Sequence, residues 1–343
     1  MNNKNIPEKM RAIQLQAYNR NIIRVLLSLK VTEINVPKPE AEQVLIKMQA
    51  APCNPSDIAF MRGGYNIKKD LPKVLGFEGS GTVVFAGRNP KAQELIGKRV
   101  SCFTQENEHG TWAEYFVTNY KNCLPIKDEM DIEQAACFFV NPFTAYGLVD
   151  YAEKRNSKTI IQNAAAGQIG DFIQKLAKEK GIKIINIVRK DEHIDELTQL
   201  GEKYVINMSS ENFETQLNEL AHNLNATTAF DAVGGEGSGQ IFNAMNQDSQ
   251  LVVYGGLSGK AVTNIDEMDL IFKNKSIKGF NLSDWIKETD KENFNKISAE
   301  LQDSIINSEI KTKIQGTIKL EEVVAGLRQY ISNMSAGKIV FEL

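Results

Sequence analysis

The stretch IIQNAAAGQIG, residues 160–170, decides the fold of this chain. It begins with apolar residues typical of a buried strand and continues into small residues that end on Gly167 and Gly170. Apolar residues then recur at helical spacing in QIGDFIQKLAKEKG, and a second apolar run, KIINIV, stops at Arg189. A strand, a small-residue turn, a helix and a second strand in this order predict two parallel strands joined by a helical crossover.

The same alternation continues through the middle of the chain. Further strand-like runs are YVIN, TTAFDAVG, QLVVYGG and SIKGF, and a helical pattern precedes each of them. This repetition predicts an α/β fold with a doubly wound parallel sheet. The first third is instead rich in β-structure, with short runs such as QVLIKMQAA and SGTVVFAG between turn residues. The boundary between the two patterns lies near CLPIKDEM, residues 123–130.

Composition limits the class of protein. The 343 residues are 42% hydrophobic and 24% charged, with a net charge of −3, and no apolar run reaches the length of a bilayer span. We therefore expect no nucleic-acid or membrane partner. The four cysteines form no C-x-x-C pair, and the N-terminal residues contain no apolar signal segment. Both features predict a cytoplasmic protein with reduced thiols.

The turn after the first strand of the alternating region suits a diphosphate. Residues 164–167 read AAAG, which lets a ligand approach backbone N–H groups at the start of a helix. Gly170 would let that helix pack closely on the strands. The pattern A-x-x-G-x-x-G has alanine where the dinucleotide fingerprint has its first glycine, and a tight strand–helix turn without a ligand also favours small residues. We take Ala166, Gly167, Gln168 and Ile169 as cofactor contacts.

The end of the second strand indicates which dinucleotide binds. An NAD site usually carries Asp or Glu there for the ribose 2′-hydroxyl, whereas this chain has Arg189 and Lys190. A guanidinium pairs well with a 2′-phosphate, so we expect NADPH. Two alternatives remain at this point. Both cations can simply solvate a strand end, and Asp191 leaves NAD open.

Several motifs together resemble a known superfamily. They are NPSDIAFMRGGY (54–65), LGFEGSGTVV (75–84), VNPFTAYGL (140–148), VVYGGLSG (252–259), IFKNKSIKGFNLSDW (271–285) and GKIVFEL (337–343). With the phosphate turn, they make the chain similar to the medium-chain dehydrogenases/reductases, in particular the zinc-free branch of quinone oxidoreductases and 2-enoyl thioester reductases. The resemblance implies a GroES-like catalytic domain (1–126), a Rossmann NADPH-binding domain (127–290) and a C-terminal segment (291–343) that returns to the catalytic domain. It also implies a homodimer.

The resemblance bears on metal binding. Alcohol dehydrogenases of this superfamily hold a catalytic zinc with a cysteine and a histidine, and this chain has Asn54 and Phe77 at those places. Cys53 lies one position away from the ligand place and reads as a small buried residue. Because neither asparagine nor phenylalanine builds a zinc site, we expect no metal.

Tyr65 is the candidate catalytic residue. In the enoyl reductases that this chain resembles, a tyrosine after N-P-S-D donates to the substrate oxygen. A phenol is protonated at neutral pH and can hydrogen-bond a developing enolate. The alternative is a packing tyrosine after a Gly-Gly turn, and quinone reductases of the branch often carry a tyrosine here too.

The resemblance assigns further residues to the cofactor. Those expected near the nicotinamide are Asn141, Thr144, Tyr254, Gly255, Gly256, Phe280 and Leu282. Lys338 is expected near the 2′-phosphate. Two residues depart from the enoyl reductase pattern, because Asn281 replaces a tryptophan and Gln168 replaces a glycine.

The sequence therefore predicts an NADPH-dependent, metal-free oxidoreductase that transfers hydride to an activated C=C bond of an enoyl thioester or enone. A quinone reductase on the same scaffold is the first alternative. A non-catalytic NADPH-binding protein is an alternative of another class.

Overall fold

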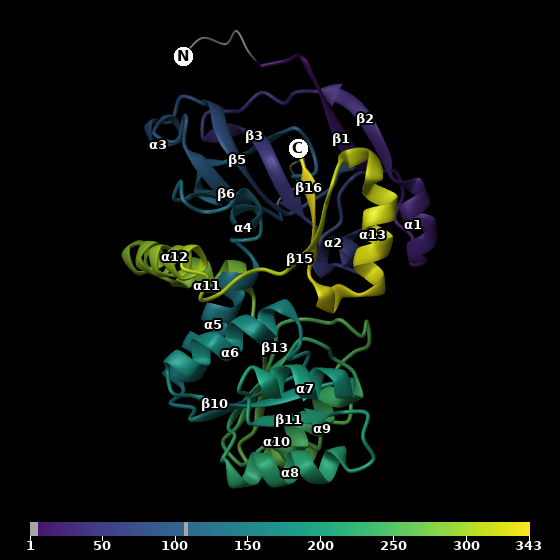
Figure 1. The fold of residues 1–343 in the computed structure, drawn as a ribbon, viewed down its shortest axis with the longest axis vertical. Coiled ribbons are helices and arrows are strands. Elements are labelled where there is room, and N and C mark those ends of the chain that lie inside the picture. Colours follow the sequence, from purple (N-terminus) through teal and green to yellow (C-terminus); the bar gives the residue numbers. More distant parts are fainter. Residues whose placement is uncertain (1–5, 106–108) are drawn as a thin grey trace. The chain divides into compact units, whose positions relative to one another are not determined.

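The computed structural model describes residues 6–105 and 109–343, which form two compact units (Figure 1). One unit contains the described residues up to Val140 together with Ser298–Leu343, and the other contains Asn141–Ile297. The expected boundary at 126/127 differs from this division. Residues 127–140 stay with the first unit because α4 (Ile132–Ala136) packs there, and Ala136 shares an apolar cluster with Ala50 and Val340.

The first unit is built mainly from antiparallel strands. Its strands are β1 (Lys9–Leu15), β2 (Lys30–Asn35), β3 (Gln43–Pro52), β4 (Lys73–Val74), β5 (Glu78–Ala86), β6 (Arg99–Phe103), β7 (Tyr115–Asn119), β8 (Cys123–Pro125), β15 (Ile314–Ile318) and β16 (Lys338–Glu342). Its helices, besides α4, are α1 (Ile22–Ser28), α2 (Pro55–Met61), α3 (Pro90–Gln93) and α13 (Val323–Ser332), with short 3₁₀ turns at Tyr120–Asn122, Leu320–Glu322 and Met334–Ala336.

The end of the chain returns to the sheet of the first unit. The sheet runs in the order β15-β16-β3-β5-β6-β8, β7 also pairs with β3, and a separate small sheet has the order β2-β1-β4. Strand β16 pairs antiparallel with β3, with Val340 opposite Pro52 and Phe341 opposite Ala51. The strand expected at KIVFEL is therefore confirmed, and it completes the sheet that carries the candidate catalytic loop.

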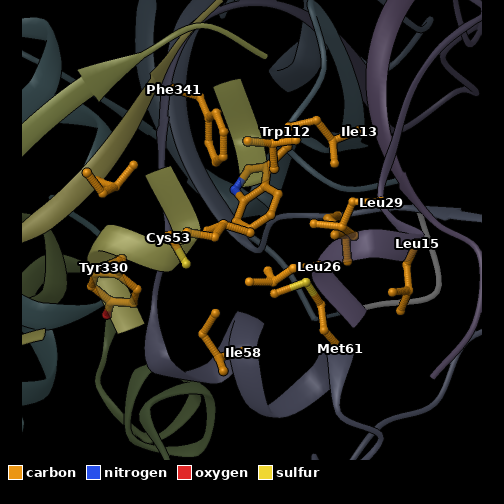
Figure 2. Packing of buried hydrophobic residues seen from close by; sticks show 14 of the residues in the cluster. Ile13, Leu15, Leu26, Leu29, Cys53, Ile58, Met61, Trp112, Tyr330 and Phe341 are labelled. Atoms are coloured by element: carbon orange, nitrogen blue, oxygen red, sulfur yellow. The ribbon is translucent and has the colours of Figure 1, made fainter. Parts of the chain in front are cut away.

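A core of apolar side chains holds the loop region of the first unit in place (Figure 2). Trp112 is fully buried, its ring centroid lies 4.7 Å from that of Phe341, and its indole N–H donates to Pro52 O at 3.0 Å. Figure 2 shows Cys53 among apolar side chains of this core, close to Tyr330. Burying one large apolar side chain stabilises a fold by about 2 kcal/mol, so this cluster fixes the base of α2.

The second unit is a parallel α/β sheet. Its strands are β9 (Thr159–Gln162), β10 (Lys183–Val188), β11 (Tyr204–Asn207), β12 (Thr228–Asp231), β13 (Gln250–Val253) and β14 (Ser276–Gly279). Its helices are α5 (Asn141–Lys154), α6 (Gln168–Glu179), α7 (Asp191–Gln199), α8 (Phe213–Asn223), α9 (Glu236–Ala244), α10 (Glu267–Phe272) and α11 (Leu282–Glu288), and α12 (Lys291–Ile306) continues into the first unit.

The strand order β11-β10-β9-β12-β13-β14 confirms the doubly wound fold. The chain reverses direction across the sheet between β9 and β12, and ligands of such sheets bind outside the carboxyl ends of these two strands. Helix α6 buries Phe172, Ile173 and Ala177, as its spacing predicts, and Gly181 follows it with a φ of +66°. The sheet thus places the small-residue turn at the switch point.

Strand β7 begins at Tyr115, and before it Ala113 forms an isolated bridge to Ala12 while the Trp112 side chain is buried in the core. Strands β1 and β2 were not predicted from the sequence. Strand β2 has no buried residue and carries a weak apolar pattern. Within the described residues, no helix has the length and apolar character needed to cross a bilayer.

Candidate functional site

The turn after β9 exposes backbone at the start of α6. Ala164 has a φ of +50°, Gly167 N–H donates to Ala164 O at 2.8 Å, and Gly167 caps α6. A Cβ at Gly170 would lie 2.5 Å from Ala165 O, so only glycine permits the close approach of α6 to the turn. Ala166, Gly167, Gln168 and Ile169 all remain partly exposed. Their backbone can therefore receive a diphosphate at the positive end of the helix.

A hydrogen-bonded pair joins the ends of the two strands at the switch point. Asn163 Nδ2 donates to Asp231 Oδ1 at 2.6 Å, and Asn163 Oδ1 accepts from Ala232 N–H at 2.8 Å. Asp231 also accepts N–H groups of Val233 and Gly234 at 2.8 and 3.0 Å. Neither Asn163 nor Asp231 was predicted from the sequence to belong to the site. A polar residue at the end of each of two neighbouring buried strands was the available signal.

The end of β10 carries a free cation. Arg189 is exposed, and in the described part of the chain its guanidinium makes no ion pair. Lys190 Nζ donates to Glu192 Oε1 at 2.7 Å. Asp191 Oδ1 accepts from Asn207 Nδ2 at 2.7 Å, which occupies that oxygen. The end of β10 therefore presents an exposed cation, while one oxygen of the following carboxylate is already engaged.

The residues expected near the nicotinamide come from three elements of the second unit. Asn141 and Thr144 are buried in the first turn of α5. Tyr254, Gly255 and Gly256 follow β13, and Tyr254 N–H donates to Asp231 O at 2.9 Å. Burial, and to a lesser degree Asp231, raise the pKa of Tyr254. A Cβ at Gly255 would lie 2.7 Å from Ala232 O, whereas a Cβ at Gly256 would meet nothing within 4 Å. Gly256 thus faces open space.

Phe280 and Leu282 flank the start of α11. A Cβ at Gly147 would lie 2.7 Å from Phe280 Cζ, so the Phe280 ring packs directly on α5. Leu282 is the first residue of α11, and it is partly exposed. Asn281 caps this helix, because its Oδ1 accepts from Ser283 N–H at 2.8 Å and from Asp284 N–H at 3.2 Å. The substitution of tryptophan by Asn281 therefore supplies a helix cap.

Tyr65 lies in the loop after α2 in the first unit, and it is partly buried. Its ring stacks on Phe77 with centroids 5.7 Å apart, and its hydroxyl oxygen accepts from Gln105 Nε2 at 2.5 Å. Burial raises the pKa of Tyr65, the Gln105 hydrogen bond lowers it, and the charge of Asp57 raises it. The phenol is therefore protonated at neutral pH and can act as a hydrogen-bond donor.

Lys338, expected near the 2′-phosphate, belongs to the first unit. Its side chain is 3% exposed, and its ammonium donates to Asn54 Oδ1 inside the first unit. Asn54 Nδ2 in turn donates to Glu78 Oε2 at 3.0 Å, and Glu78 Oε1 accepts Val140 N–H at 2.7 Å. A buried ammonium needs such compensation, so Lys338 is committed to this network. We therefore leave Lys338 out of the cofactor contacts proposed below.

Asp57 adds a second buried carboxyl group beside this network. Its Oδ2 accepts Asn54 N–H at 2.8 Å, and its Oδ1 has no hydrogen-bond partner among the described residues. Burial is the largest influence and raises the pKa of Asp57 to about 7, with backbone N–H groups and Lys338 opposing it. Asp57 thus changes charge near neutral pH.

Comparison with known proteins identifies the family. The alcohol dehydrogenase GroES-like domain matches residues 40–128, and the zinc-binding dehydrogenase family matches residues 169–301. The mitochondrial enoyl-[acyl-carrier-protein] reductase of Xenopus tropicalis is 33% identical over 286 residues, which is 81% of this chain and 80% of the relative. This chain belongs to the medium-chain dehydrogenase/reductase superfamily.

Solved structures of the superfamily agree with this membership. A candidate NADPH:quinone reductase from Mesorhizobium loti is 33% identical with a TM-score of 0.92, and the match covers 98% of this chain and 99% of the other. A second candidate NADPH:quinone reductase, from Bacillus thuringiensis, is 26% identical with a TM-score of 0.85 and the same coverage. Like other medium-chain reductases, this chain is an oxidoreductase whose family implies an NAD(P) cofactor.

The two positions that hold zinc ligands in alcohol dehydrogenases of the superfamily make other contacts in this chain. Asn54 bonds to Lys338 and Glu78, and Phe77 stacks on Tyr65. Residues 6–105 and 109–343 contain no group of three or more His, Cys, Asp or Glu side chains that could hold a metal ion. Cys53 is buried among apolar side chains, where desolvation raises its thiol pKa well above its ordinary value.

The expected site residues are divided between the two units. The phosphate turn, Arg189, Lys190 and the residues expected near the nicotinamide all belong to the second unit. Tyr65 and Lys338 belong to the first unit, and Gln105, which the sequence analysis did not consider, contacts Tyr65 directly. No sequence signal pointed to Gln105, because it follows β6 in a loop without a motif.

Proposed function

We propose that this protein is an NADPH-dependent reductase of activated C=C bonds in enoyl thioesters or enones. The observation that carries the proposal is the Tyr65 phenol, a partly exposed hydrogen-bond donor on a rigid aromatic support. The similarity to enoyl reductases supports the same substrate class. Reduction of an α,β-unsaturated carbonyl builds negative charge on the carbonyl oxygen, which a positioned donor stabilises.

The cofactor site divides into three parts in this proposal. The backbone of Ala166, Gly167, Gln168 and Ile169 holds the diphosphate at the start of α6. Arg189, assisted by Lys190, pairs with the 2′-phosphate. Bound NADPH would supply the hydride from its nicotinamide ring.

The nicotinamide end is held by the remaining residues of the second unit. Asn141 and Thr144 offer polar groups from α5, and the backbone of Tyr254, Gly255 and Gly256 offers a flat surface after β13. Phe280 and Leu282 supply apolar surface that excludes water from the ring. Exclusion of water strengthens each polar contact in the site.

Tyr65 carries the chemistry that the chain itself supplies. Its hydroxyl donates a hydrogen bond to the substrate carbonyl oxygen and stabilises the enolate. Because burial raises the pKa of Tyr65, the phenol keeps its proton through the neutral range.

A quinone reductase is the second candidate, and one observation favours it. The Mesorhizobium loti protein, which matches nearly the whole chain, is described as a candidate NADPH:quinone reductase. The two candidates share the cofactor site and differ in the acceptor.

Steady-state oxidation of NADPH with crotonyl-CoA and with 1,4-naphthoquinone separates the candidates. If the protein is an enoyl reductase, we expect saturable turnover of crotonyl-CoA that depends on Tyr65. A quinone reductase should not depend on Tyr65 for turnover. Turnover with the quinone alone assigns the second candidate. Tight NADPH binding without turnover on either acceptor would indicate a non-catalytic binding protein.

We also propose a homodimer in a cytoplasmic setting. Strand β14 is at the end of the sheet order and pairs along one edge with β13. Exposed apolar side chains occur in β14 and at the end of α10, which precedes it in the sequence: Ile277 is 38% exposed and Phe272 is 76% exposed. An unpaired edge with apolar side chains favours pairing with a second copy. All four cysteines are free, which suits a reducing compartment.

A further inference from the structure

The contact between Gln105 and Tyr65 has a definite polarity. Gln105 follows β6 in the first unit, and its Nε2 donates to the Tyr65 hydroxyl oxygen at 2.5 Å. An amide nitrogen only donates, whereas a phenol has one O–H donor and an oxygen that accepts. The phenol oxygen is thus the acceptor in this contact, and its own proton remains available for a third group.

The surroundings of Tyr65 leave its ring little freedom. Phe77 stacks on it at 5.7 Å and meets Phe60 edge-on at 5.4 Å. Lys69 Nζ lies 5.6 Å from the centroid of Phe77, and Lys69 is itself buried. Since the ring is fixed by packing, only the direction of the hydroxyl hydrogen can still vary. The hydrogen does not point toward Gln105, because the Gln105 amide is itself a donor.

We propose that Gln105 is a positioning residue that turns the Tyr65 hydroxyl hydrogen away from the protein and toward the substrate carbonyl oxygen. This inference rests on the proposed reductase function. A carboxylate in place of the amide would reverse the contact, because it would accept the phenol proton and hold it. The hydrogen bond also opposes the effect of burial on the pKa of Tyr65, so it stabilises the phenol oxygen when that oxygen gains negative charge.

Three variants separate polarity from packing. Gln105→Glu keeps the size and reverses the hydrogen bond. Gln105→Met keeps the length and removes the bond. Asn66→Asp adds a carboxylate at an exposed neighbour of Tyr65 and controls for charge alone.

We expect Gln105→Glu to lower kcat for crotonyl-CoA about tenfold or more at pH 8, which is about 1.4 kcal/mol of barrier. Gln105→Met should cost about threefold or less, and Asn66→Asp about twofold or less. Equal losses in the Glu and Met variants would overturn the inference.

A double variant tests whether Gln105 acts through Tyr65. If it does, Gln105→Glu should cost little further activity when added to Tyr65→Phe, since the group it controls is already gone. Independent, multiplicative losses would show that Gln105 affects the site by another route.

An absorbance titration gives a readout that needs no turnover. The phenol signal of Tyr65 is the difference between the wild type and Tyr65→Phe at rising pH. Gln105→Glu should move that titration to higher pH than Gln105→Met does, because a carboxylate holds the phenol proton. This result supports the polarity even where crotonyl-CoA is not reduced, in which case only the proposed substrate class fails. Identical titrations in both variants would contradict the polarity itself.

Discussion

Asn207 donates a hydrogen bond of 2.7 Å from its side-chain amide to Asp191 Oδ1. Asn207 is the last residue of β11, and Asp191 is the first residue of α7. The acidic group nearest the end of β10 is therefore tied to the neighbouring strand, while Arg189 before it is exposed. This arrangement leaves a cation as the group available to a cofactor at that strand end.

Arg189→Ala should weaken NADPH binding much more than NADH binding. A guanidinium–phosphate pair contributes about 1.5–3 kcal/mol, so the Kd for NADPH should rise about tenfold or more, and the Kd for NADH should change about twofold or less. Fluorescence titration with both nucleotides measures the two values. Lys183→Ala, at the opposite end of β10, is the matched control and should affect neither. Equal weakening of both nucleotides would show that Arg189 does not contact the 2′-phosphate.

Tyr65→Phe should lower kcat for crotonyl-CoA about tenfold or more, because the variant loses the donor to the developing enolate. The ring still stacks on Phe77, so folding and NADPH binding should be unchanged. Single-turnover oxidation of NADPH separates the chemical step from product release. A loss smaller than tenfold on that step would show that Tyr65 is not the hydrogen-bond donor to the substrate.

Gly256→Ala tests the surface expected to face the nicotinamide. The new methyl group meets no protein atom within 4 Å, so the melting temperature should stay within about 2 °C of the wild type. If the backbone here contacts the nicotinamide ring, the Kd for NADPH should rise about fivefold or more. Gly237→Ala in α9, where the methyl group would meet only Met208 Cε at 3.3 Å, serves as the control. Undiminished NADPH affinity in Gly256→Ala would place the ring elsewhere.

Asp57 should make the stability of the protein fall as the pH rises. The folded state raises the pKa of Asp57 from 3.8 to about 7, so between these values the folded protein holds a proton that the unfolded chain has lost. The unfolding free energy therefore decreases as the pH rises through this window. Asp57→Asn does not titrate, so its unfolding free energy relative to the wild type should increase by about 2 kcal/mol between pH 5.5 and 7.5.

Urea unfolding at fixed protein concentration measures this difference. Asp70→Asn changes an exposed carboxyl group in the same unit and should show no comparable trend. Parallel pH curves for Asp57→Asn and the wild type would mean that Asp57 is ionised in the folded protein throughout.

The edge of β14 should carry the contact between two copies of the chain. Phe272→Asp together with Ile277→Asp places charges on this exposed apolar surface, and we expect a shift from dimer to monomer in sedimentation equilibrium. Leu27→Asp on α1, where the side chain is 68% exposed, is the matched control and should leave the dimer intact. A dimer that persists in the double variant would show that another surface carries the contact. A monomeric wild type would show that there is no dimer.

The parallel unit could be predicted from the sequence because its signals are local. The apolar run before residues 164–167, the spacing of Phe172, Ile173 and Ala177, and the helix stop at Gly181 each follow from neighbouring residues. The close approach at Gly170 is likewise encoded by the absence of a side chain. Such signals specify a strand–turn–helix unit without knowledge of distant contacts.

The catalytic side was harder to predict because its contacts are long-range. Gln105 reaches Tyr65 across forty positions in the sequence, and Lys338 reaches Asn54 across 284. Two buried carboxyl groups, Asp57 and Glu78, also interact with the Lys338 charge: burial raises the pKa of each, and this charge lowers it. Charge compensation in an interior depends on tertiary packing, which no local pattern reveals.

Calorimetric titration of the intact wild-type chain with NADPH and then with NADH tests the central claim most directly. The account predicts saturable binding of NADPH that is at least about tenfold tighter than that of NADH, from the phosphate pairing at Arg189. Absence of binding heat for either nucleotide across a range of temperatures, or tighter binding of NADH, would contradict it.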